Sequence, residues 1–302
     1  MADILIHCVL IICMPPLLFG VINRTKAIFA GRTGAPLLQP YYDLFRLLRK
    51  GSVFSRTTTW VFRAAPAITL AATLTAALLI PLGNHVPPLS FNGDMILFVY
   101  LLALGRFFTT SAALDTGSSF EGMGAAREVT FSCLAEPVLF VALLVLSRLS
   151  GSLSLSGILT NSSTTLWVTS GATLVLLVAS LFCVLLAENS RIPFDDPTTH
   201  LELTMIHEAM ALDHSGPAFG MILYAASLKL FILGAFFLHV LLPIRVIGSL
   251  LDWFIFLISM ILLAVTIGVV ESSMARFRLV RIPQMLLAAS VLSAFALMLV
   301  LR

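Results

Sequence analysis

Side chains that can exchange protons crowd the segment 188–208. Its carboxylates and imidazoles are Glu188, Asp195, Asp196, His200, Glu202, His207 and Glu208. Asp196 is a favourable N-cap, and Pro197 after it suits the first helical position, so we predict a helix from this point. On such a helix His200, His207 and His214, which are seven residues apart, would form one stripe.

This histidine stripe is a poor candidate for a metal site. Residues seven apart on a helix lie about 10 Å from each other, whereas metal-ligand pairs on one helix face come three or four residues apart. We therefore predict a polar seam or a hydrated passage and no metal ion. Two interpretations remain open, namely a proton relay and packed histidines at a subunit contact.

Three more ionisable groups fall within or beside apolar runs. Glu128 and Glu136 are separated by about 12 Å along a helix, which is too far for direct contact and suits a step linked by water. Lys229 lies inside an apolar run, where a charge facing lipid is costly, so it should face an acid or water. We expect its partner to be Glu136 or a carboxylate of the segment 188–208. Acids at membrane depth are functional candidates by default.

The elements that hold these groups are predicted to be membrane-spanning helices. Of the 302 residues, 59% are apolar and 11% are charged, whereas a soluble domain has about 25% charged residues. This excludes a soluble globular domain, and the net charge of +3 does not indicate nucleic-acid binding. At about 20 residues per span, the apolar runs predict spans at 4–22, 62–82, 95–110, 131–147, 165–187, 218–243, 247–270 and 283–301. The third is short because Arg106 interrupts it.

The predicted fold class is all-α, a polytopic membrane protein of about eight transmembrane helices forming a single transmembrane domain over residues 1–302. Most basic residues fall in the odd-numbered loops, which the positive-inside rule places in the cytoplasm, with both termini outside. Most acids share those loops, and only Asp3, Asp94 and Asp252 lie outside. Cytoplasmic loops that carry both signs of charge favour docking to a cytoplasmic partner.

The first loop predicts an interfacial helix. A turn rich in glycine and proline at 31–40 precedes an amphipathic segment with Tyr41, Leu44, Phe45 and Leu48 on one face. With the other cytoplasmic loops it would form a heel on the membrane domain.

The cysteines do not suggest a metal centre. Cys8, Cys13, Cys133 and Cys183 include no C-x-x-C pair, so this chain alone provides neither a zinc ribbon nor an iron–sulfur ligand set. We expect no metal and no cofactor on this chain.

The loops resemble those of a known family, the membrane subunit that anchors the peripheral arm in respiratory complex I and its hydrogenase relatives. The similarity is greatest to group-4 NiFe hydrogenases and formate hydrogenlyase. The segments that carry the resemblance are 31–50, 105–108, 114–118, 124–128, 136–137, 192–195, 215–216 and 271–278.

The resemblance implies an eight-helix bundle whose heel docks hydrogenase-like large and small subunits and an iron–sulfur protein. The 4Fe-4S cluster and the NiFe site would lie in those partners, and antiporter-like subunits would lie beside this chain in the membrane. Acids at the positions of Glu128, Glu136, Asp195 and Glu202 would line a hydrated path. We add Lys229, His200, His207 and Glu208 to this proton or ion path. To docking we assign Arg32, Arg46, Arg49, Asp115, Arg127, Arg191, Asp196, Arg276 and Arg278.

The segment after Asp196 departs from the family pattern, because relatives carry a Glu-rich run where this chain has threonine, histidine and Glu202. We therefore expect a non-redox subunit that couples electron transfer to proton or sodium translocation in a multi-pass plasma-membrane complex. The alternatives are a related complex without hydrogen chemistry, using quinone or another acceptor, and a passive anchor. A stand-alone transporter fits poorly because the sequence shows no internal repeat.

Overall fold

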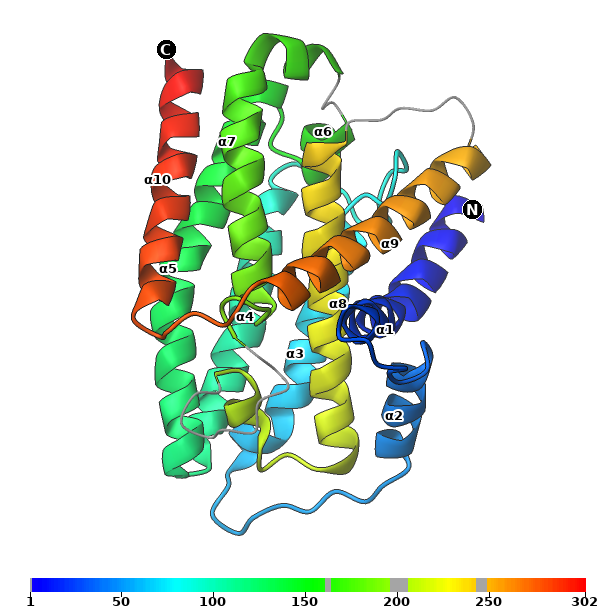
Figure 1. Ribbon diagram of the computed structural model, residues 1–302, viewed down its shortest axis with the longest axis vertical. Helices are drawn as coiled ribbons and strands as arrows, with labels where there is room; N and C mark the ends of the chain where they lie inside the picture. The colour runs from blue at the N-terminus through cyan, green and yellow to red at the C-terminus, as the bar shows by residue number, and fades with distance from the viewer. Residues whose placement is uncertain (1, 161–163, 196–205, 243–248) are drawn as a thin grey trace.

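The computed structural model describes all residues except 1, 161–163, 196–205 and 243–248 (Figure 1). The described chain is helical and contains no strand. Its elements are α1 (Ala2–Phe29), α2 (Gln39–Leu48), α3 (Trp60–Leu79), α4 (Asp94–Asp115), α5 (Ser119–Ser150), α6 (Leu155–Thr160), α7 (Thr164–Glu188), the 3-10 helix η1 (Glu208–Ala211), α8 (Gly216–Leu241), α9 (Ser249–Ser273) and α10 (Arg281–Leu301). Within these residues eight helices are long and apolar enough to cross a membrane, which confirms the predicted fold class.

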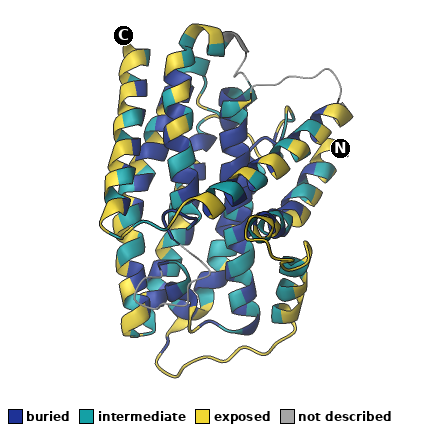
Figure 2. Ribbon diagram, in the orientation of Figure 1, coloured by how far each residue is buried: buried dark blue, intermediate teal, exposed yellow. Residues whose placement is uncertain are grey.

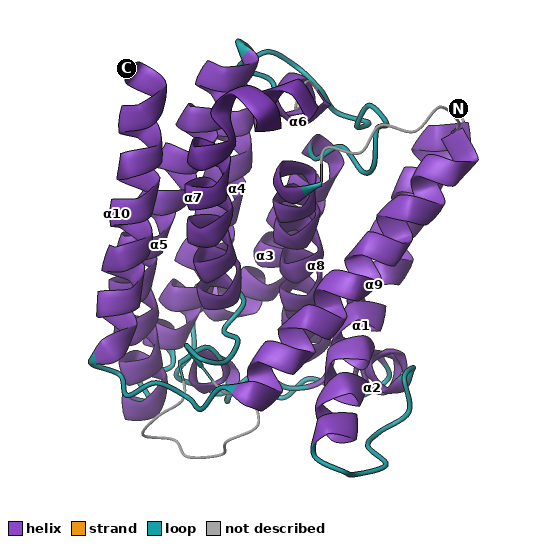
Figure 3. Ribbon diagram, turned by 45° about the horizontal axis from the view of Figure 1, so that its top comes forward, coloured by secondary structure: helices purple, strands orange, loops and turns teal. Residues whose placement is uncertain are grey.

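Helix α8 occupies the centre of the bundle. Its side chains are buried along most of its length, whereas α10 is exposed along one side (Figure 2). Helices α1 and α9 lie side by side and cross the bundle at a slant (Figure 3). The two ends of the chain lie at the same end of the bundle, as an even number of spans requires.

The longest loops gather at the other end, which we call the loop-rich end. They are 30–38, 49–59, 189–215 and 274–280. Hydrogen bonds join them: Ser215 Oγ accepts from Val53 N at 2.9 Å, and Phe277 N donates to Pro193 O at 3.0 Å. Gly216 (φ 55°) begins α8 so close to Gly51 that a Cβ atom would lie 2.6 Å from the Gly51 carbonyl oxygen. These loops therefore form one connected layer.

Two predicted spans are longer in the structure than the apolar runs. The third, expected at 95–110, is the continuous helix α4, which passes through Arg106. The fourth, expected from 131, begins at Ser119 and has 32 residues. Such a helix is about 48 Å long, more than the roughly 30 Å of a bilayer core, so α5 also reaches into the loop-rich end.

The first loop contains the expected amphipathic helix as α2. None of its residues is buried, and Tyr42, Phe45 and Leu48 are exposed. The Tyr41 hydroxyl turns the other way and donates to the carbonyl of Cys13 in α1. Burial of this phenol raises the pKa of Tyr41 above its ordinary value. The helix is thus anchored on α1 and presents an aromatic face outward.

Candidate functional site

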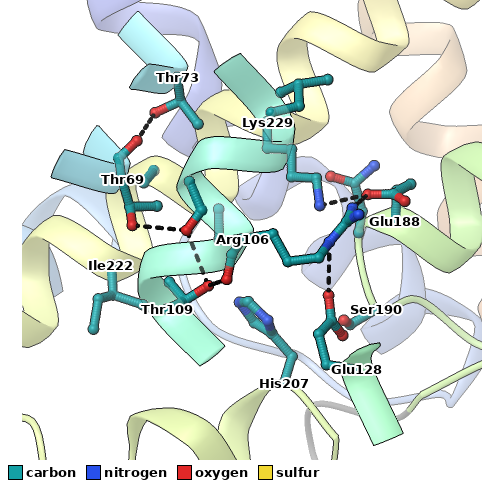
Figure 4. A pocket seen from close by; sticks show the side chains of 15 residues that line it. Thr69, Thr73, Arg106, Thr109, Glu128, Glu188, Ser190, His207, Ile222 and Lys229 are labelled. Carbon is teal, nitrogen blue, oxygen red and sulfur yellow. Dashed lines mark hydrogen bonds and ion pairs between the residues drawn. The ribbon is translucent and has the colours of Figure 1, made fainter. Parts of the chain in front are cut away.

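Arg106 forms the centre of a cluster of charges inside the bundle. Its guanidinium pairs with Glu136 through Nη1 and with Glu188 through Nη2, while Nε lies 3.4 Å from Glu128 Oε1. The side chain of Arg106 is 8% exposed, so its charge depends on these three carboxylates. The partners come from α5 and α7, and one cation therefore joins three helices (Figure 4).

Lys229 of α8 completes this group. Its Nζ lies 2.7 Å from Glu188 Oε2, so Glu188 contacts both cations (Figure 4). Of the two kinds of partner predicted for Lys229, the structure selects the carboxylate of the segment 188–208. We call Arg106, Glu128, Glu136, Glu188 and Lys229 the Arg106 cluster. It contains three carboxylates and two permanent cations, and this excess of acid suits a site that takes up a proton.

A cavity of about 60 Å³ adjoins the cluster (Figure 4). Thr69, Thr109 and His207 line it together with most of the cluster. A buried water needs roughly 10–15 Å³ and two to four polar partners, so the cavity has room for a few waters. The predicted link between Glu128 and Glu136 therefore has two physical carriers, the Arg106 guanidinium and the cavity water.

His207 enters this cavity from the loop layer. Asp195 Oδ2 accepts from the backbone N–H groups of Ile206 at 3.1 Å and His207 at 3.3 Å. The other oxygen of Asp195 pairs with Arg276 at 2.9 Å. Burial lowers the pKa of His207, and the nearby Glu128 carboxylate opposes this. Asp195 thus lies outside the cavity and positions the imidazole that lines it.

A second buried ion network lies between α1, α9 and the segment 189–195. Glu271 pairs with Lys26 Nζ at 3.0 Å and with Arg191 Nη1 at 3.4 Å. The Arg191 guanidinium also covers the ring of Phe19, 4.3 Å from its centre. Burial lowers the pKa of Arg191, and Glu271 opposes this. This network closes the loop layer against the slanted helix pair.

The predicted path residues divide into three sets. Glu128, Glu136, Lys229 and His207 are brought together at the cavity, whereas Asp195 and Glu208 lie in the adjoining loop layer. Glu202 and His200 lie outside the described residues. Arg106 and Glu188 were not assigned to the path, although each contacts two or more of the cluster's charges. The reasoning used for Lys229, that a charge within a span must face a partner, would have found Arg106.

The residues assigned to docking are not equally accessible. Arg32, Arg46, Arg49 and Arg278 are exposed, Arg127 and Arg276 are half-buried, and Asp196 lies outside the described residues. Asp115 accepts from the backbone and the hydroxyl of Thr59 at 2.7 and 2.9 Å, which stabilises the start of α3. Arg191 is 5% exposed and is an internal ion-pair partner, so the structure places it away from the surface.

The continuous histidine stripe is wrong for the part of the segment that the structure describes. Between His207 and His214 only Glu208–Ala211 is helical, and that turn is a 3-10 helix. The close approach of α5 explains this, because a Cβ at Gly124 would lie 2.9 Å from the Ile206 carbonyl oxygen. His207 therefore lines the cavity, while His214 stacks on Phe62 of α3 with ring centres 3.9 Å apart.

The His214 stack predicts a loss of stability in acid. Burial lowers the pKa of His214 to about 4, while an unfolded histidine titrates near about 6.5. Between these values the unfolded chain binds more protons, so the contribution of His214 is complete above about pH 6.5 and declines toward pH 4. The melting temperature in detergent should fall from pH 7 to pH 5.

The control for this prediction is His214→Phe, which keeps an aromatic ring on Phe62 and removes the titration. The melting temperature of this variant should fall less between pH 7 and pH 5 than that of the natural chain. Equal falls in the two proteins would show that His214 does not control acid stability.

Comparisons with known proteins agree along the whole chain. Residues 2–302 match the NADH dehydrogenase family. Formate hydrogenlyase subunit 4 of Escherichia coli (strain K12) is 32% identical over 282 residues, which is 91% of this chain and 90% of the relative. Hydrogenase-4 component C of the same organism is 30% identical over 91% of this chain and 87% of the relative. One component of the NADH-quinone oxidoreductase of Anaplasma phagocytophilum (strain HZ) is 29% identical over 67% of this chain and 64% of the relative.

A solved structure shows the same fold. A chain of the membrane-bound sulfane sulfur reductase, an archaeal respiratory membrane complex, superposes with a TM-score of 0.84. The match covers 99% of this chain and 100% of that chain at 21% identity. The eight-helix arrangement therefore occurs in an assembled respiratory complex.

Proposed function

The chain belongs to the NADH dehydrogenase family, as its resemblance to complex I and hydrogenase membrane subunits predicted, and from this premise we propose how it works. It is a multi-pass membrane subunit of an energy-converting complex. Its role is to dock a peripheral arm carrying NiFe and iron–sulfur centres and to couple electron transfer there to proton or sodium translocation. It performs no redox step itself.

The observation that carries this proposal is the Arg106 cluster. A passive anchor has no need of three carboxylates and two cations beside a cavity within the bundle, since buried charges cost more than well-packed apolar residues. Glu188 contacts both cations, so a change in the charge of either alters the proton affinity of this shared carboxylate. The cluster can therefore convert a charge or loop displacement into proton movement.

The loop layer is the element that would transmit the displacement. It contains His207, which lines the cavity, and Asp195, which holds His207 and Arg276. The exposed basic residues Arg32, Arg46 and Arg49 lie in the same layer and are suited to an acidic partner surface. We propose that this end faces the cytoplasm, that both termini are outside, and that antiporter-like subunits lie beside the chain in the membrane.

The electron acceptor is a separate question, because the fold serves more than one chemistry. Two relatives are named for hydrogenase and formate hydrogenlyase complexes, and the solved structure is a sulfane sulfur reductase. The identities of at least 30% to the first two favour hydrogen chemistry in the arm. A complex using another acceptor is the second candidate.

The test is Glu136→Gln in the intact complex, purified through a tag on this chain and reconstituted in liposomes. Reduced viologen supplies electrons, hydrogen is measured by gas chromatography, and ion translocation is followed with pH- and sodium-sensitive dyes. Hydrogen formation should persist. Translocation should fall by about 100-fold, because a positioned proton-transfer group contributes roughly 10²–10⁴-fold. Asp213→Asn, which neutralises an exposed carboxylate outside the cluster, is the matched control.

Each outcome of this experiment is informative. Full translocation in assembled Glu136→Gln would identify a passive anchor or a path that avoids Glu136. Viologen oxidation without hydrogen in the unaltered complex would favour the second candidate. Loss of hydrogen formation in Glu136→Gln alone would contradict a non-redox role for the cluster.

A further inference from the structure

A second group of ionisable side chains lies at the end of the bundle opposite the loop-rich end. It surrounds the loop 81–93 between α3 and α4. Asp3 and His7 come from α1, His85 from the loop, His239 from α8 and Asp252 from α9. None of these residues belongs to the Arg106 cluster. They hold the loop against three helices.

The loop is held from two sides at Gly83 and Asn84. Asp252 Oδ2 accepts from the Asn84 N–H at 2.6 Å, and the Gly83 carbonyl lies 2.7 Å from His239 Nε2. Gly83 has φ 60°, and a Cβ atom there would lie 2.7 Å from Asp252 Oδ2, so glycine is required for this approach. His85 stacks on Trp253 with ring centres 4.2 Å apart.

His239 has an unusual hydrogen-bonding environment. Its Nδ1 lies 2.7 Å from the carbonyl oxygen of Ala235, while Nε2 lies 2.7 Å from that of Gly83. Carbonyl oxygens only accept, and a neutral imidazole has one N–H. A neutral ring would therefore direct a nitrogen lone pair at an oxygen lone pair on one side. Only the imidazolium, with two N–H groups, satisfies both contacts.

The surroundings also favour a cation at this position. His239 lies in the last turn of α8, where the helix dipole stabilises positive charge. The acids facing the group are Asp3, whose Oδ1 is 3.7 Å from His85 Nδ1, and Asp252, whose Oδ2 is 3.5 Å from His85 Nε2. Against them stand the imidazoles of His85 and of His7, which bonds to the Ala77 carbonyl of α3 at 3.4 Å.

From this geometry we propose that His239 is a proton-binding site, in which an imidazolium clamps the loop 81–93 to α8 at the end opposite the Arg106 cavity. When the proton leaves, one carbonyl contact must be lost. Ala235 is fixed within the helix, so the Gly83 contact is the one released. The loop is then held through Asp252 and Asn84.

This site is separate from the Arg106 cluster. His239 and Lys229 are ten residues apart on α8, or about 15 Å along its axis. The residues between them, 230–238, are apolar or glycine and are all buried, and they offer no proton carrier along this helix. The proposal therefore does not rest on the coupling function.

Solid-state 15N NMR of the complex in liposomes, with 15N-labelled histidine, tests the protonation state. At about pH 7.5, one unit above the ordinary imidazole pKa of about 6.5, most histidines are neutral. We expect a ring with both nitrogens protonated, and this signal should disappear in His239→Gln. His214→Phe is the control and should remove a neutral ring only. Identical imidazolium signals in the natural chain and His239→Gln would overturn the proposal.

Amide hydrogen exchange of the loop 81–93 gives an independent readout. In His239→Gln, exchange at Gly83–His85 should accelerate by about tenfold or more, as expected for loss of a charge-assisted hydrogen bond. His239→Lys keeps a cation and should exchange nearly as slowly as the natural chain. Exchange in His239→Gln that equals the natural rate would show that the ring does not clamp the loop.

Discussion

Replacing Arg106 with methionine is expected to be among the most destabilising single changes in this chain. The guanidinium is the shared partner of Glu128, Glu136 and Glu188, and its side chain is 8% exposed. Its removal leaves three carboxylates beside one lysine. Breaking a buried ion pair by removing one partner costs about 3–5 kcal/mol. The free energy of unfolding should fall by about that amount, measured in detergent through the melting temperature.

Two variants make this measurement specific. Arg148→Met removes an exposed arginine from α5 and should change the free energy of unfolding by less than about 0.5 kcal/mol. Adding Glu128→Gln to Arg106→Met should restore part of the lost stability, because it removes one uncompensated carboxylate. If Arg106→Met melts with Arg148→Met, or if the second change brings no recovery, the cluster does not carry the charge balance assigned to it.

Replacing Lys229 with methionine is expected to separate stability from coupling. Glu188 keeps Arg106 as a partner, so the loss of unfolding free energy should be about 2 kcal/mol, below that of Arg106→Met. Under the proposed function, the reconstituted complex should still transfer electrons, while ion translocation should fall by about 100-fold because Glu188 loses the cation that tunes its proton affinity. The two quantities are measured as for Glu136→Gln.

A double-mutant cycle identifies Glu188 as the partner through which Lys229 acts. Glu188→Gln combined with Lys229→Met should destabilise by less than the sum of the two single changes, since both break the same 2.7 Å ion pair. Lys50→Met, which removes an exposed lysine from the first loop, should leave both stability and translocation near the natural values. Additive single changes would show that Lys229 acts through another group.

The spans could be predicted from the sequence, but their ends could not. Apolar runs gave eight helices, because the cost of exposing polar side chains to lipid is set residue by residue. Helix α4 was predicted too short because Arg106 interrupts its apolar run, whereas three carboxylates on other helices neutralise that charge. Helix α5 begins early because its polar first turns are covered by other parts of the chain: Glu121 is buried and accepts from the Asp213 N–H at 2.8 Å.

The candidate site was predicted in its members and not in its connections. Glu128, Glu136 and Lys229 were singled out because charges at membrane depth need a partner, and this rule applies to each residue alone. That Arg106 joins the two glutamates, and that Glu188 lies between both cations, depends on how α4, α5, α7 and α8 pack. The segment 206–215 shows the same limit, since its spacing indicated a helix and the contact with α5 imposed a different backbone.

The sequence by itself therefore determined the class of protein, its eight spans and the charges that need partners. Hydropathy and charge act locally, and they are legible along a single chain. The tertiary structure alone decided which charges meet, because the ion pairs of the Arg106 cluster join residues 22 to 82 positions apart. The same reason holds at the opposite end, where Gly83 and His239, 156 positions apart, meet only after the helices have packed.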